Sequence, residues 1–111
     1  MSNDILGRIA REIQDERHRQ VERGLFGGSQ YLHNIGVLAR AGAAYSLMAG
    51  TRDWTRGRQC GLASPPIWFP WERSMWRPIS PRTDLVRASA MLMGEIELLD
   101  QSSAREGETY V

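Results

Sequence analysis

The stretch NIGVLARAGAAYSLM, residues 34–48, decides the fold. It is apolar nearly all round and contains no carboxylate, and its first residue Asn34 and the following Gly50 are typical helix caps. Because a helix that is hydrophobic on every side is usually buried, we expect this to be the central helix of the domain. Gly36 and Gly42 each cost about 1 kcal/mol of helix propensity relative to alanine, which close packing against a neighbouring backbone should offset.

A first helix is predicted to run from about Asn3 or Asp4 to Arg23, with Gly24 as its C-cap. Apolar residues recur along it at helical spacing and predict a buried stripe: Ile5, Leu6, Ile9 and Ile13. Continued at 100° per residue, this stripe meets Glu16 and then Gln20, so two polar groups occupy positions where apolar ones are expected. Most of the other basic residues should be solvated: Arg8, Arg11, Arg17, His18 and Arg19.

A segment rich in proline and tryptophan, residues 64–81, separates the second helix from the third. It contains all five prolines and three of the four tryptophans, so it should be irregular and should pack its large rings against the helices. Ser80 as N-cap and Pro81 at the first helical position then predict the start of a third helix. Its predicted buried stripe is Leu85, Ala88, Leu92, Ile96 and Leu99. We expect a flexible tail over residues 102–111, which leaves one helical domain over residues 1–101.

Composition limits the classes of partner. The chain has 111 residues and a net charge of +1, so no global field draws it to nucleic acid or to a membrane. Its longest apolar stretch is broken by Arg40 and is too short to span a bilayer. Cys60 is the only cysteine, which is typical of a reducing compartment. The sequence therefore predicts a cytoplasmic protein with no membrane partner and no specific nucleic-acid partner.

Glu16 is the first candidate for chemistry, because it lies centrally on the apolar face of the first helix. An unpaired buried carboxylate is costly, so it must form an ion pair, bind a metal or take up a proton. Arg40 or Arg87 would be its structural partner. Gln20, one turn further on, extends the same polar patch and favours contact with a ligand instead. The sequence leaves both roles open.

Asp84 and Glu95 lie on one flank of the third helix, 11 residues apart in the sequence. That spacing is about 16 Å along the helix axis, so the two cannot share a metal ion and at most one can join Glu16. Asp84 also falls in the first turn, where a carboxylate complements the helix dipole without any ligand. His33, at the start of the second helix, is a further candidate for a structural or a ligand-binding role.

Four groups of residues occur in order along the chain: Glu16–Gln20, Trp68–Trp71, Asp84–Ala88 and Glu95–Asp100. They resemble the E-R-x-R-Q motif, the W-P-W segment and the D-L-V-K-A…A-E-I-E-R-L-D helix that mark a family of short phage and prophage proteins. That family is similar to the all-α nucleoside triphosphate pyrophosphohydrolases of the MazG kind.

The resemblance implies a helical domain, usually oligomeric, whose acidic side chains hold Mg²⁺ against the phosphates of a nucleotide. Glu16, Asp84 and Glu95 match acidic positions of the family, and the implied metal ligands are Glu16 and Asp84. The chain departs from the family where an H-D-D run usually precedes the second helix, because it has Ser29–Leu32 there. Without those acids the site would hold a nucleotide but would be poorly built to activate water.

We therefore predict a MazG-like bundle of three principal helices, completed by a homodimer or larger homo-oligomer. The predicted function is that of a phage-type binding protein, which sequesters a nucleotide or nucleotide-derived signal or binds a host defence protein. The alternative is Mg²⁺-dependent hydrolysis of a nucleoside triphosphate to the monophosphate and pyrophosphate. The residues predicted to contact the ligand are Glu16, Gln20, His33, Arg40, Asp84, Arg87 and Glu95.

Overall fold

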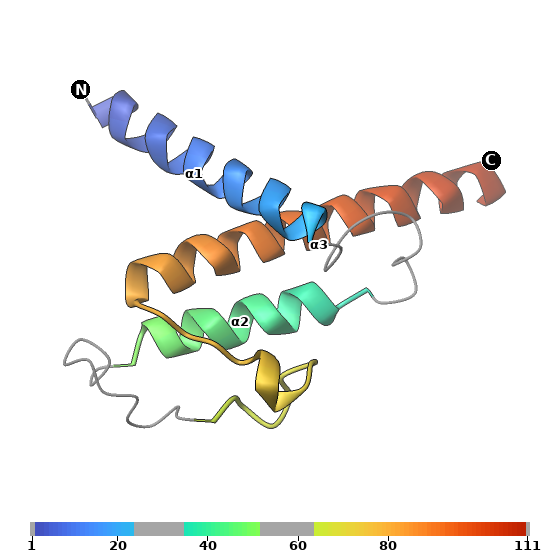
Figure 1. Ribbon diagram of the computed structural model, residues 1–111. Coiled ribbons are helices and arrows are strands. Elements are labelled where there is room, and N and C mark those ends of the chain that lie inside the picture. Colours follow the sequence, from blue (N-terminus) through green and yellow to red (C-terminus); the bar gives the residue numbers. More distant parts are fainter. Residues whose placement is uncertain (1, 24–34, 52–63, 111) are drawn as a thin grey trace.

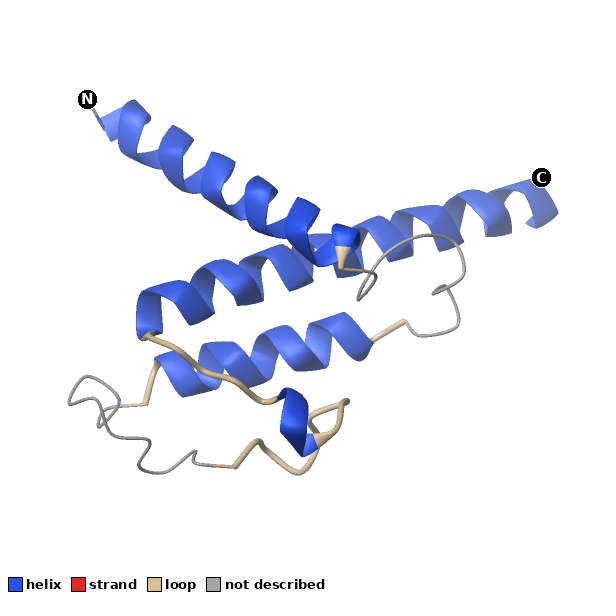
Figure 2. Ribbon diagram, in the orientation of Figure 1, coloured by secondary structure: helices blue, strands red, loops and turns tan. Residues whose placement is uncertain are grey.

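The computed structural model describes residues 2–23, 35–51 and 64–110, and all regular secondary structure within them is helical (Figure 1; Figure 2). The elements are α1 (Ser2–Glu22), α2 (Val37–Ala49), the short 3-10 helix η3 (Arg73–Met75) and α3 (Pro81–Tyr110). The predicted all-α class with three principal helices is thus confirmed. Over these residues, no helix combines the length and the apolar character that crossing a membrane requires.

α3 is the helix that contacts both of the others. α2 packs alongside its first half and runs in the opposite direction, and the end of α1 packs across its middle (Figure 1). The prediction that the second helix is central is therefore wrong. α3 takes that place because it is 30 residues long, against 13 for α2, and has apolar side chains on more than one face.

The core lies between α2, α3 and the proline- and tryptophan-rich segment. Its buried residues are Leu38, Ala41, Ala44, Tyr45 and Met48 of α2, Ala88, Met91 and Leu98 of α3, and Phe69 and Trp76 of the segment. The Trp76 ring lies 4.7 Å from the Tyr45 ring and 5.2 Å from the Phe69 ring, centroid to centroid. Aromatic packing thus holds the segment against α2, as expected. Trp68 is instead 43% exposed, because it lies on a turn closed by the hydrogen bond from Phe69 N to Pro66 O.

Two glycines allow the helices to approach closely. A Cβ atom at Gly42 would lie 3.1 Å from the carbonyl oxygen of Ala88, so α2 touches the α3 backbone there. A Cβ atom at Gly94 would lie 2.7 Å from Cζ of Arg17 and 2.9 Å from Cδ1 of Leu38. Gly94 therefore marks the point where all three helices meet.

The predicted buried stripe of α1 is largely exposed. Ile5, Leu6 and Ile9 are 51%, 66% and 36% exposed, because the N-terminal half of α1 diverges from α3 (Figure 1). The prediction for Arg17 is wrong in the opposite sense. It was expected to be solvated, but it is buried where α1 crosses Gly94, and its Nε donates to Oε1 of Glu97 at 2.6 Å.

The predicted stripe of α3 is also wrong in part. Ala88 is buried, but the four large residues of that stripe are exposed: Leu85, Leu92, Ile96 and Leu99. The buried face lies one residue away around the helix and comprises Asp84, Ala88, Met91, Glu95 and Leu98. Sequence periodicity identified an apolar face of α3, but this helix has two.

The ends of two helices differ from those predicted. α2 begins at Val37 and not at Asn34, because Gly36 before it has the left-handed conformation with φ 97°. α3 begins as predicted, with the Thr83 N–H donating to Oγ of Ser80 at 3.2 Å. It then continues as regular helix to Tyr110, past the predicted end of the domain at residue 101, because no proline interrupts it. Asn34 and Gly24 lie outside the described residues.

Replacing Gly94 with alanine tests the three-helix contact. Gly94→Ala should lower the free energy of unfolding by about 1–3 kcal/mol, because the added methyl group must displace Arg17 or Leu38. Gly7→Ala is the matched control in α1, where the nearest atom to the new Cβ is Nη1 of Arg11 at 3.5 Å. It should stabilise the protein by about 0.5–1 kcal/mol. Urea unfolding of both variants measures the difference, and equal effects would contradict the close contact at Gly94.

Candidate functional site

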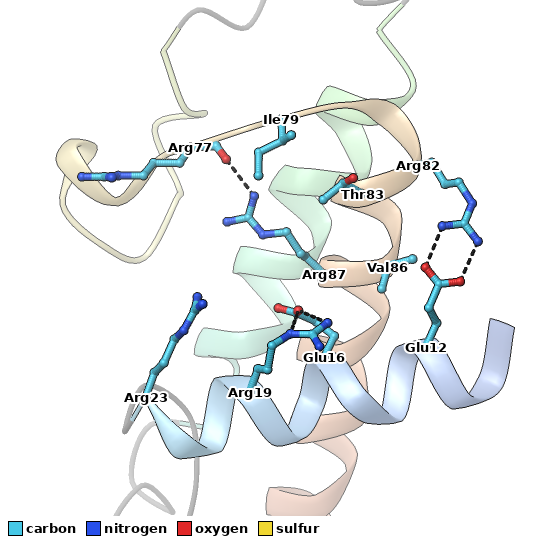
Figure 3. A pocket seen from close by; sticks show the side chains of 10 residues that line it. All are labelled: Glu12, Glu16, Arg19, Arg23, Arg77, Ile79, Arg82, Thr83, Val86 and Arg87. Atoms are coloured by element: carbon cyan, nitrogen blue, oxygen red, sulfur yellow. Dashed lines mark hydrogen bonds and ion pairs between the residues drawn. The ribbon is translucent and has the colours of Figure 1, made fainter. Parts of the chain in front are cut away.

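A pocket of about 390 Å³ opens between α1, the residues before α3 and the first turns of α3 (Figure 3). Its lining contains five arginines and two glutamates. The lining residues are Glu12, Glu16, Arg19, Arg23, Arg77, Ile79, Arg82, Thr83, Val86 and Arg87. This excess of guanidinium groups over carboxylates makes the arginine pocket, as we call it, attractive to anions.

Both glutamates of the arginine pocket are already paired. Glu12 accepts two hydrogen bonds from Arg82, each of 2.7 Å, and they hold the pKa of Glu12 below its usual value. Glu16 accepts a hydrogen bond of 2.9 Å from Nε of Arg19. Among the described residues, Arg23 has no carboxylate partner and extends from the end of α1 towards the pocket (Figure 3). The pocket therefore keeps unneutralised positive charge.

Arg87 is held rigidly on the inner side of the pocket. Its guanidinium lies 4.6 Å from the centre of the Tyr45 ring and donates to the carbonyl oxygen of Arg77 at 2.7 Å. Weaker contacts join it to the Tyr45 hydroxyl at 3.3 Å and to Oδ1 of Asp84 at 3.5 Å. Because these contacts fix its position before any ligand arrives, Arg87 is preorganised to meet an anion.

A second, smaller cavity of about 70 Å³ adjoins the arginine pocket. Glu16, Arg23 and Arg87 line both cavities. The remaining residues of this recess are mostly aromatic or sulfur-containing: Gln20, Tyr45, Trp71, Met75 and Met91. The partly buried Trp71 ring packs edge-to-face on Phe69 at 5.7 Å. We call this cavity the aromatic recess.

Gln20 connects α1 to α3 at the edge of the recess. The side chain is buried, and its Nε2 donates to Oε2 of Glu16 and to the carbonyl oxygen of Arg87, both at 3.2 Å. Its Oε1 is buried as well and receives no hydrogen bond from any residue that the structure describes. Glu16 thus pairs with Arg19 and Gln20, and the predicted structural pairing with Arg40 or Arg87 is wrong. Arg40 lies exposed on α2 and lines neither cavity.

Glu95 has a structural partner that the sequence did not reveal. Its Oε2 accepts from the Gly36 N–H at 2.8 Å, and its Oε1 accepts from the Ala39 N–H at 3.1 Å. These are amides at the beginning of α2, which has no side-chain cap of its own. Glu95, on α3, is therefore the N-cap of a different helix, and both carboxylate oxygens are engaged.

Asp84 is fully buried at the start of α3. Its Oδ1 accepts from the Ile79 N–H at 3.0 Å, while Oδ2 receives no hydrogen bond from the described parts of the chain. Burial raises the pKa of this carboxyl, although the Ile79 amide and the nearby Arg87 oppose that shift. Asp84 therefore fixes the turn into α3 and does not line the pocket.

These carboxylates do not fit a Mg²⁺ site. The ion prefers several oxygen ligands in octahedral geometry. Glu16 is bonded to Arg19 and Gln20, Asp84 is enclosed, and Glu95 caps α2. Within the described ranges, no three His, Cys, Asp or Glu residues lie close enough together to hold a metal. His33 lies outside those ranges.

Comparisons of the chain with protein-family models, with curated proteins and with solved structures found no match.

Three of the predicted ligand-contacting residues come together in the structure: Glu16, Gln20 and Arg87 line the aromatic recess. Sequence reasoning missed the recess ring of Trp71 and the other four arginines of the pocket: Arg19, Arg23, Arg77 and Arg82. The one sequence feature that could have indicated an arginine-lined pocket is that all 14 residues of the Lys and Arg types are arginine. It gave no positions, because the pocket gathers residues from both ends of the chain.

The buried Asp84 predicts a specific pH dependence. Because its folded-state pKa is raised, its contribution to stability is greatest below the unfolded-state pKa of about 3.9 and declines as the pH rises through the folded-state value. Asp84→Asn should remove this component, so that the difference in unfolding free energy between wild type and variant changes with pH and then levels off. Urea unfolding from pH 3.5 to pH 8 measures it. A difference that is constant over this range would show that the carboxyl is not perturbed.

Proposed function

We propose that the protein binds a small phosphorylated ligand with a planar ring, a nucleotide or a nucleotide-derived signal, and sequesters it. The observation that carries the proposal is the continuity of the arginine pocket with the aromatic recess. Glu16, Arg23 and Arg87 line both cavities, so one ligand can contact cationic and aromatic groups at once.

The arginine pocket supports the phosphate part of this ligand. A guanidinium group presents several N–H donors in a plane and matches the oxygens of a phosphate in bidentate geometry. Arg87 is fixed by Tyr45 and by the carbonyl oxygen of Arg77, and Arg23 faces it from the end of α1. In the proposal, these two arginines from separate helices hold one phosphate group of the ligand.

The aromatic recess supports the ring. Trp71 offers aromatic surface, and the exposed Met75 adds polarisable apolar contacts, while Tyr45 and Met91 form the buried wall behind them. Gln20 adds a buried amide oxygen that receives no hydrogen bond from the described residues, which is an acceptor suited to a ring amino group. A phosphate alone would leave these groups unused.

Binding without turnover accords with the roles of the acids. Hydrolysis of the MazG kind needs carboxylates that hold Mg²⁺ against phosphates, whereas Asp84 fixes the turn into α3, Glu95 caps α2 and Glu16 is paired. The other predicted partner, a host defence protein, rests on the resemblance to phage proteins, and no described surface identifies such a partner. The small-ligand proposal is therefore the one that the geometry supports.

Calorimetric titration with pyrophosphate and with a panel of nucleoside mono-, di- and triphosphates tests the proposal. Arg23→Gln should weaken binding of every phosphorylated ligand by about tenfold, the effect of losing one charged hydrogen bond. Arg40→Gln is the matched control, since Arg40 is exposed and lies outside both cavities. Its binding should equal that of wild type. Equal losses of affinity in the two variants would mean that the ligand is attracted only by the overall charge of the protein.

Trp71→Leu separates the two halves of the site. It should weaken nucleotide binding about tenfold, within the range for loss of one stacking contact, while pyrophosphate binding is unchanged. Trp68→Leu is the control, because Trp68 lines neither cavity. If Trp71→Leu leaves nucleotide affinity intact in a folded protein, the recess is not part of the site.

Pyrophosphate release over the same nucleotide panel, with Mg²⁺ or Mn²⁺, distinguishes sequestration from catalysis. We expect no turnover, and we expect Glu16→Gln to change nucleotide affinity while the fold is kept. Turnover on the order of 1 s⁻¹ that disappears in Glu16→Gln would establish the hydrolase alternative instead.

A further inference from the structure

A single carboxylate stands where the arginine pocket joins the aromatic recess. Three residues line both cavities, and Glu16 is the acid among them, beside Arg23 and Arg87. The other glutamate of the arginine pocket, Glu12, does not line the recess. Asp84 and Glu95 serve the scaffold, as described above. Glu16 is therefore the described carboxylate that a ligand spanning both cavities would meet.

The Glu16 carboxylate is held in place by its own helix and keeps one acceptor position open. Arg19 approaches Oε1 with both Nε and Nη2, each at 2.9 Å, and Nε2 of Gln20 donates to Oε2 at 3.2 Å. An ionised carboxylate accepts about four hydrogen bonds, two at each oxygen. The described residues fill both positions on Oε1 and one on Oε2, so Oε2 can accept one more. The side chain is 14% exposed and is directed from α1 into the pocket, where a ligand can reach it (Figure 3).

The open acceptor position is on the side of the recess. Of the two residues that hold the carboxylate, Arg19 lines the arginine pocket alone and Gln20 lines the aromatic recess alone. Oε1, which is bound to Arg19, therefore faces the pocket, and Oε2, which is bound to Gln20, faces the recess. A donor group of the ligand that reaches Oε2 lies at the junction of the two cavities.

The junction suits the sugar of a nucleotide. Like charges repel strongly in a partly desolvated site, so a phosphate lies against Arg23 and Arg87 and not against the Glu16 carboxylate. The recess, at about 70 Å³, is far smaller than the roughly 300 Å³ or more of pockets that enclose a whole small ligand, so it takes the ring alone. Because the sugar of a nucleotide connects the ring to the phosphate, it lies between the cavities, where its hydroxyl groups can donate to Glu16.

We propose that Glu16 selects ribose: its Oε2 accepts a hydrogen bond from the 2′-hydroxyl of a ribonucleotide, and the site discriminates against the 2′-deoxyribonucleotide. This inference rests on the proposed function, because it requires a nucleotide in the site. The 2′-hydroxyl is on the sugar carbon next to the one that carries the ring, so it is the hydroxyl nearest to the recess. A hydrogen bond to an ionised acceptor is about twice as strong as one between neutral groups. A ligand without the hydroxyl leaves that acceptor unfilled, which is how a site built to bind a hydroxyl rejects the analogue that lacks it.

Calorimetric titration of the wild-type protein, without added Mg²⁺, tests the selection. The ligands are ADP, GDP, CDP and UDP and their 2′-deoxy counterparts. For each base that binds, the ribonucleotide should bind at least about tenfold more tightly, the effect of one charged hydrogen bond. Equal affinities of the ribo and deoxy forms overturn the ribose selection and leave the proposed function standing. No binding of any of these nucleotides overturns the proposed function, and the ribose selection with it.

Glu16→Met removes the acceptor and keeps an unbranched side chain of similar length. It should bring the ribo and deoxy affinities to about the same value and, because a negative charge is lost, should tighten pyrophosphate binding about threefold. Damage to the fold would weaken both classes of ligand, so opposite changes identify a direct contact. The matched control is Glu12→Met, which removes the pocket carboxylate that pairs with Arg82 outside the recess. It should keep the full preference for ribose.

A preference for ribose that persists in Glu16→Met, or that disappears equally in Glu12→Met, overturns the role of Glu16. If Glu16→Met does not fold, Glu16→Gln takes its place, because it keeps the length of the side chain and one acceptor oxygen. The preference should then fall about threefold, since the hydrogen bond to the hydroxyl becomes one between neutral groups. An unchanged preference in a folded Glu16→Gln protein likewise overturns the proposal.

Discussion

The carboxylate of Glu95 makes the interaction on which the rest of this structure depends. α2 begins after a left-handed glycine and has no side chain to cap its first amides, so α3 supplies the acceptor from outside. A charged group accepting two amide hydrogen bonds, one oxygen for each, is stronger than a neutral cap and sets the position of α2 along α3. The adjacent Gly94 lets Arg17 of α1 and Leu38 of α2 reach the same point of α3. The adjacent residues Gly94 and Glu95 therefore position all three helices.

The position of α2 in turn determines the chemistry of the site. Tyr45 is fully buried on α2, and its hydroxyl accepts from the Arg77 N–H and donates to the carbonyl oxygen of Met75. The face of the same ring packs against the guanidinium group of Arg87. Because Asp84 holds the turn into α3 and Glu95 caps α2, neither lines the pocket to neutralise its arginines. The pocket is thus cationic because these carboxylates are engaged elsewhere in the fold.

Local features of the fold could be predicted from the sequence, and its tertiary contacts could not. Ser80 and Pro81 predicted the start of α3, and Gly50 predicted the end of α2, because caps act within a few residues of the chain. Glu95 appeared to be a ligand, since a cap that comes from a distant helix leaves no local pattern. The buried face of α3 was misassigned because two apolar faces give similar periodicities, and only the partner helix decides between them. Glu16 and Gln20 were identified correctly as a polar patch, but the surrounding arginines come from separate elements.

The claim that the carboxylates serve the scaffold while the arginines bind the ligand is tested most directly by ¹H–¹⁵N NMR during titration with a nucleoside diphosphate and Mg²⁺. Our account predicts that the side-chain signals of Arg23, Arg87 and the Trp71 indole shift with ligand concentration, while the amides of Gly36 and Ala39 keep their positions. The opposite result, with the Gly36 and Ala39 amides shifting as Mg²⁺ and nucleotide draw the Glu95 carboxylate away from α2, would contradict it.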